Sequence, residues 1–119
     1  MTRKEYLRHL TSVKIDVKRV NKVASEYGTE LPEIIGKIVS DAKETIFFDD
    51  EYRVLSLDEI VEAENDLHVK FKEKGILPLV DCGENDFIVF HFNDDFWSKF
   101  NINDETVFQK RDRLEELME

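Results

Sequence analysis

Apolar residues recur every three or four positions over the first third of the chain, and this spacing predicts amphipathic helices. One helix is expected over residues 12–27, because Gly28 follows it as a left-handed stop. Residues 3–9 either extend this helix or form a separate turn. A second, shorter helix is expected to open at Leu31-Pro32, where proline suits a first turn, and to end near Ala42.

The clearest local signal is Ser56-Leu57-Asp58-Glu59, which fits a capping box. It predicts a helix over residues 57–74, with an apolar stripe from Leu57 to Phe71 and Gly75 as its stop. Asn103 resembles the cap of a last helix, because acidic residues follow in the first turn and apolar positions recur from there to Met118.

Between these helices the pattern changes to β-type runs that are separated by polar turns. The middle run of the last three, residues 86–92, is apolar on both alternating sets and should therefore be central and covered on both faces. In the run that follows it, Trp97 is expected on a more open face, either against the last helix or as an interface anchor. The predicted strands are residues 45–48, 52–55, 76–81, 86–92 and 96–102.

The predicted order is α-α-β-β-α-β-β-β-α, which indicates an α+β fold with an antiparallel sheet packed against helices. No linker, internal repeat or low-complexity segment divides the sequence, so we expect a single domain over residues 1–119.

Composition narrows the function classes. The 119 residues carry a formal net charge of −10, which repels nucleic acid and anionic lipid. No apolar run is long enough to span a membrane, and the amino terminus does not resemble a signal peptide, so we expect a cytoplasmic protein. One cysteine, Cys82, and three scattered histidines offer no familiar zinc spacing, and no cofactor is expected.

The charge is unevenly distributed. Residues 1–27 have a net charge of +4, whereas residues 28–119 have a net charge of −14. The densest part, residues 41–66, has ten carboxylates and only two basic residues, Lys43 and Arg53. The helix dipole favours acids in the first turn after Ser56 but not farther along, so the excess indicates a basic partner, while any single carboxylate fits a solvated surface equally well. The candidate carboxylates are Asp49, Asp50, Glu51, Asp58, Glu62 and Asp66.

Four elements of the sequence, in order, resemble the SUKH superfamily, which includes the Smi and Knr-type cell-wall synthesis regulators. They are the helix end Glu26-Tyr27-Gly28, the helix that opens at Leu31-Pro32, the helix start Leu55-Ser56-Leu57-Asp58-Glu59-Ile60, and the hairpin Leu77-Pro78-Leu79-Val80-Asp81 with Gly83-Glu84-Asn85-Asp86 and Phe87. Ser40-Asp41-Ala42-Lys43 replaces the glycine-rich turn usual in that group, and Asn85 stands where a second glycine is common. The resemblance implies an α+β fold and no catalytic residues. Its bacterial members are commonly immunity proteins that neutralise toxins, often nucleases.

We therefore expect a non-enzymatic protein-binding module, an immunity protein whose acidic surface occludes a basic toxin. A regulatory scaffold for an endogenous protein is the first alternative. A small metal-dependent enzyme is the second, because several carboxylates and His91 cluster around two turns, although turns also favour Asp and Asn for their own hydrogen bonds. These turn residues are Asp81, Glu84, Asp86, His91, Asp94 and Asp95.

Overall fold

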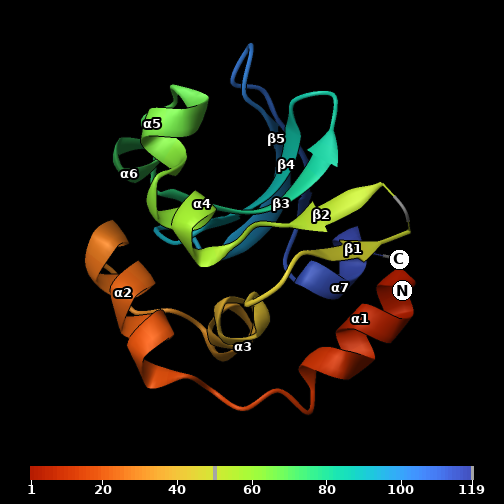
Figure 1. Ribbon diagram of the computed structural model, residues 1–119. Coiled ribbons are helices and arrows are strands. Elements are labelled where there is room, and N and C mark those ends of the chain that lie inside the picture. The colour runs from red at the N-terminus through yellow and green to blue at the C-terminus, as the bar shows by residue number, and fades with distance from the viewer. Residues whose placement is uncertain (50, 119) are drawn as a thin grey trace.

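The computed structural model describes residues 1–49 and 51–118 and has the predicted α+β architecture. Its six strands form one antiparallel sheet in which each strand pairs with the next in sequence (Figure 1). The strand β4 is central and buried from Phe87 to His91, as predicted. The strands are β1 (Ile46–Phe48), β2 (Tyr52–Val54), β3 (Ile76–Gly83), β4 (Asp86–His91), β5 (Phe96–Asn101) and β6 (Val107–Arg111).

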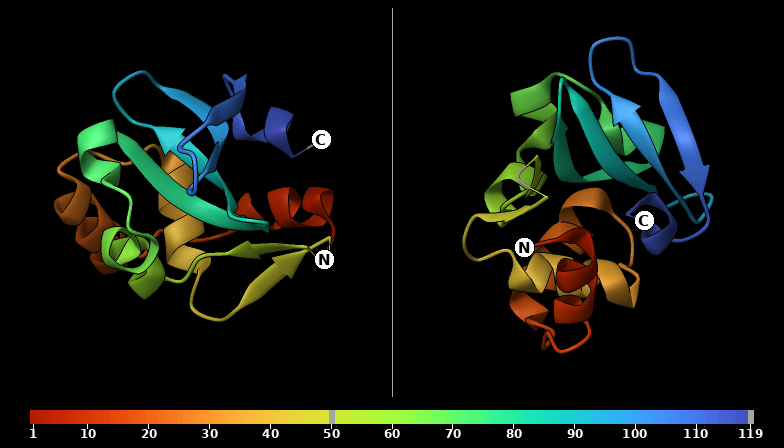
Figure 2. Two further views of the ribbon diagram at one scale, coloured as in Figure 1. Left: turned by 90° about the horizontal axis from the view of Figure 1, so that it is seen from above. Right: turned by 90° about the vertical axis from the view of Figure 1, so that its right-hand side faces the viewer.

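Helices cover both faces of this sheet (Figure 2). On one face Phe71 contacts Phe100, and on the other Tyr6 stacks on Phe48 with ring centroids 5.1 Å apart. The apolar side chains from both layers belong to one hydrophobic core. In the part of the chain that is described, no helix combines the length and apolar character needed to cross a membrane. The helices are α1 (Arg3–Leu10), α2 (Val17–Tyr27), α3 (Glu33–Asp41), α4 (Leu57–Val61), α5 (Ala63–Leu67), α6 (Phe71–Lys74) and α7 (Leu114–Leu117).

The amino-terminal helices differ from the prediction in where they begin. Residues 3–10 form a separate helix with its own capping box, in which Thr2 and Glu5 each accept a backbone N–H. The predicted helix over residues 12–27 begins only at Val17, because Asp16 caps it and donates its own N–H to Ser40 Oγ at 2.8 Å.

The helix predicted over residues 57–74 is interrupted, and α4, α5 and α6 occupy that segment. The main break is at His68, which ends α5 with a left-handed φ of 57°. In a continuous helix Val69 and Phe71 would point roughly 200° apart. Both are buried, at 4% and 0% exposed, so the chain turns between them to bring both into the core.

The prediction of a helix after Asn103 was wrong. Asn101 Oδ1 accepts the backbone N–H of Asn103 at 2.9 Å, so these residues form a turn. The chain then returns as β6 beside β5, and only α7 is helical. The acidic residues that seemed to favour a helix start belong to this turn.

Tyr6 provides a test of the core. It is 0% exposed, and within the described residues its hydroxyl has no hydrogen-bond partner. An unpaired buried hydroxyl costs about 1–3 kcal/mol, whereas an apolar group of the same shape does not. Tyr6→Phe should therefore raise the free energy of unfolding by about 1 kcal/mol in urea titrations.

Tyr27 is the matched control for this substitution. It is also buried, but its hydroxyl donates to the Ile60 carbonyl at 2.8 Å. Tyr27→Phe should therefore lower the free energy of unfolding by about 1 kcal/mol. A loss of stability in both variants would show that the Tyr6 hydroxyl has a partner.

Candidate protein-binding surface

The structure divides the acidic residues of the 41–66 segment into two groups. Four are ion-paired: Asp41 with His9, Asp49 with Arg3, Glu59 with Arg53, and Glu64 with Lys72. The second group is exposed and, among the described residues, forms no ion pair: Glu44, Glu51, Asp58, Glu62 and Asp66. Asp50 lies outside the described residues.

Three members of the second group lie on one face of α4 and α5. Although the two helices are separate, their hydrogen bonds continue across the junction at Glu62. The Glu62 N–H donates to the Asp58 carbonyl at 2.9 Å, and the Asp66 N–H donates to the Glu62 carbonyl at 3.0 Å. This spacing stacks the three residues one turn apart. We call Asp58, Glu62 and Asp66 the acidic ridge.

An ion cluster adjoins the ridge on the sheet. Arg53 of β2 donates two hydrogen bonds to Glu59, at 2.6 and 2.8 Å, and its Nη2 lies 3.6 Å from Asp81. Glu59 also accepts the Ser56 N–H at 3.0 Å, which completes the predicted capping box. Bonding to Arg53, then to Ser56, lowers the pKa of Glu59 below its ordinary 4.5. The cluster therefore fixes the start of α4 to the sheet.

The pKa of Glu59 gives a pH prediction. The folded protein favours the ionised form of this carboxylate. Its contribution to the free energy of unfolding is therefore complete above pH 4.5 and is lost as the pH falls through the lowered pKa of the folded state. Glu59→Gln should cost about 1 kcal/mol of unfolding free energy at pH 7, and the difference from wild type should shrink at pH 3.5. Urea titrations at both pH values measure it. Glu44→Gln, at an exposed carboxylate, is the control, and a Glu59→Gln deficit that is the same at both pH values would contradict this role.

Of the predicted turn carboxylates, Asp49 differs from the ridge because it is bonded to another element. Asp49 has a left-handed φ of 54° and accepts hydrogen bonds from the backbone N–H and Nε of Arg3. The Arg3 guanidinium also lies 4.7 Å from the centroid of the Tyr52 ring. Asp49 thus ties α1 to the β1–β2 turn, while Glu51 remains exposed.

Trp97 is not on an open face, contrary to the sequence prediction. It is 4% exposed and packs on Phe90, with ring centroids 5.1 Å apart. It is therefore not available as an interface anchor. The prediction for this strand was wrong because Ser98 and Lys99, the polar residues that follow Trp97, are also largely covered by the fold. Polar residues in β5 therefore do not mark an exposed face.

The exposed aromatic that sequence reasoning missed is Phe47, which is 52% exposed. It is the direct cross-strand neighbour of Arg53, so it extends the ion cluster toward the sheet edge. The alternation of side chains along β1 could have indicated that Phe47 is exposed. Ile46 and Phe48 must face the same side of β1, and burial of Phe48 leaves Phe47 pointing outward.

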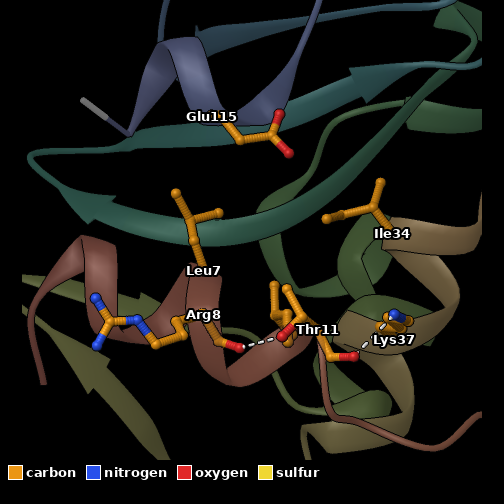
Figure 3. A pocket seen from close by; sticks show the side chains of 7 residues that line it. Leu7, Arg8, Thr11, Ile34, Lys37 and Glu115 are labelled. Carbon is orange, nitrogen blue, oxygen red and sulfur yellow. Dashed lines mark hydrogen bonds between the residues drawn. The ribbon is translucent and has the colours of Figure 1, made fainter.

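A hollow of about 310 Å³ lies between α1, α3 and α7 (Figure 3). Leu7 and Ile34 lie on its two sides, and Glu115 projects from α7 (Figure 3). Lys37 at its edge already has partners, because its Nζ donates to the Thr11 carbonyl at 3.4 Å and lies 3.6 Å from Glu33. The hollow has apolar sides, and the charged side chains of Arg8 and Glu115 also line it.

The groups considered for catalysis have structural contacts. His91 Nε2 lies 2.8 Å from Ser98 Oγ, as a hydrogen-bonded core histidine should, and Ser98 is 0% exposed. Burial lowers the pKa of His91. Burial also raises the pKa of the Cys82 thiol to about 12, which keeps it protonated. The pair His91–Ser98 is thus closed to a substrate.

The turn carboxylates also have local partners. Asp81 accepts the Gly83 N–H at 2.9 Å, and Asp86 accepts from Asn101 Nδ2 at 2.9 Å. Asp81 therefore bonds the backbone of this hairpin, and Asp86 bonds the side chain of a residue in β5. Over residues 1–49 and 51–118, no three His, Cys, Asp or Glu side chains converge as a metal site.

Comparison of the chain with protein-family models, curated proteins and solved structures found no match.

Proposed function

We propose that the protein is a non-enzymatic, cytoplasmic binding module whose acidic ridge occludes a basic protein partner. The observation that supports the proposal is the ridge itself. Asp58, Glu62 and Asp66 are exposed, stacked one turn apart, and form no ion pair with any described residue. Like charges at this spacing cost a few tenths of a kcal/mol per pair. Asp58 and Asp66 lie in the first turns of α4 and α5, where the helix dipole favours an acid, but the Glu62 side chain makes no capping bond at the start of α5, so stability does not explain the whole row.

The partner class follows from electrostatics. A net charge of −10 attracts a cationic protein over several ångströms and raises the rate of encounter. A nuclease needs a cationic cleft for its substrate, and a row of carboxylates can occupy such a cleft. Together with the SUKH resemblance, this makes a nuclease toxin the proposed partner and immunity the proposed role.

Phe47 supplies the apolar contact that charge alone does not. Rim charges affect association rate more than affinity, whereas buried aromatic anchors dominate binding energy. Phe47 is exposed beside Arg53, and the ion cluster joins it to the start of α4. The proposed interface therefore combines an acidic ridge with one aromatic anchor.

The test is capture followed by rescue. The wild-type protein and a variant with lysine at Asp58, Glu62 and Asp66 are used as baits in the same lysate, and the captured protein is then expressed in cells. We expect the wild type to capture a basic protein that arrests growth. Co-expression of the wild type, but not of the variant, should restore growth. A captured partner that is not toxic would favour the scaffold alternative, and a partner bound equally by both baits would remove the ridge from the interface.

A further inference from the structure

A small cavity of about 70 Å³ lies below the ridge, where α5 meets the sheet. Its walls include the apolar side chains of Leu55, Leu67 and Phe87, and Asp66 and Asp81 contribute carboxylates. This volume is well below the roughly 300 Å³ at which small-molecule sites begin. It suits the end of one side chain rather than a metabolite.

The charges around the cavity favour a cation. Three carboxylates, from Glu59, Asp66 and Asp81, line it together with one guanidinium, from Arg53. Arg53 is directed to Glu59 by two hydrogen bonds and lies 3.6 Å from Asp81. Asp66 is exposed and has no ion pair among the described residues, so one carboxylate at this cavity remains open to an incoming cation.

The walls restrict the kind of cation. A hydrated metal ion would gain nothing from Leu67 and Phe87, whereas Arg and Lys side chains lay their methylene stems along apolar surface and keep the charge at its edge. A guanidinium is also planar and more weakly hydrated than an ammonium, and it can bond a carboxylate through two N–H groups.

We infer that this cavity is the socket for an arginine side chain of the protein partner. The stem lies against Leu67 and Phe87, and the guanidinium donates to Asp66. The inference rests on the proposed function, because it names the partner residue that anchors the basic surface on the ridge. It also gives Asp66 a role different from those of Asp58 and Glu62, which attract the partner without lining this cavity.

The test uses a probe that does not require the partner. N-acetyl-arginine amide is titrated into the ¹⁵N-labelled protein, with N-acetyl-citrulline amide as a neutral probe of the same shape and N-acetyl-lysine amide as a second cation. We expect saturable amide shifts around Leu55, Leu67 and Phe87 with a Kd on the order of 1–10 mM for arginine. Lysine should bind several-fold more weakly, and citrulline should give no saturable shift.

Two variants with the same charge change separate the socket from the ridge. Asp66→Asn should weaken binding of the arginine probe about fivefold, the size of one exposed ion pair. Glu62→Gln, on the ridge but outside the cavity, should leave it unchanged, and thermal melts confirm that both variants fold.

Shifts spread over all acidic residues, equal effects from the two variants, equal binding of citrulline, or no saturable binding would each overturn the socket. None of these results would affect the proposed function, since the ridge can still capture and neutralise a basic partner. Failure of the capture and rescue experiment with a functioning socket would instead overturn the proposed function.

Discussion

Phe71→Asp should unfold the protein. Phe71 is 0% exposed in α6, and its ring centroid lies 6.1 Å from that of Phe100. The new carboxylate would therefore be buried among apolar groups. Such a change costs about 4 kcal/mol or more, a large fraction of the roughly 5–15 kcal/mol that stabilises a domain. Loss of the cooperative thermal transition in circular dichroism measures the effect.

Phe47→Asp is the matched control, because it makes the same substitution at a phenylalanine that is 52% exposed. It should keep a cooperative transition and change the free energy of unfolding by about 1 kcal/mol or less. Phe71→Asp with a wild-type melting temperature would mean that α6 does not pack on the sheet as described.

The sequence predicted the parts of the fold in which local chemistry and burial agree. Ser56 and Glu59 make both hydrogen bonds of the expected capping box. β1 and β2 pair antiparallel as expected, and the two-sided apolar pattern of residues 86–92 identified the central strand. In each case a short segment contains the whole signal.

The errors occur where tertiary contacts decide the local structure. Nothing in the residues around His68 requires a left-handed conformation, since that break forms only because Val69 and Phe71 both enter the core. The turn at Asn103 is a local exception: the side chain of Asn101, two residues earlier, accepts its N–H, and the residue types that favour a helix cap also favour such turns. β6 exists because β5 offers it an edge.

The candidate surface was predicted in part. The spacing of Asp58, Glu62 and Asp66 indicated a shared helical face, and the hydrogen bonds through α4 and α5 preserve it. Asp49 could not be separated from these residues by sequence, because its partner, Arg3, lies 46 positions away. The cavity below Asp66 was also beyond prediction, since its lining comes from segments that meet only in the folded sheet.

Replacing Asp58, Glu62 and Asp66 together by lysine should produce the largest loss of partner binding. The three side chains form no ion pair with described residues, so the variant should stay within about 1 kcal/mol of wild-type stability. Asp58 and Asp66, in the first turns of α4 and α5, should contribute most of the change. Association with the captured partner should slow by about tenfold or more at low ionic strength. The remaining binding should depend much less on salt.

The control triple has the same charge change at a different place. Asp94, Asp112 and Glu116 are exposed, and they line a hollow formed by the β4–β5 turn, β6 and α7, with no lining residue in common with the cavity below Asp66. Lysine at these three positions should slow association far less. Rates measured at about 0.01 M and 0.15 M salt, where the Debye length falls from about 30 to about 8 Å, separate long-range attraction from contact. Equal slowing by both triples would show that only net charge matters, and no slowing by the first would place the interface elsewhere.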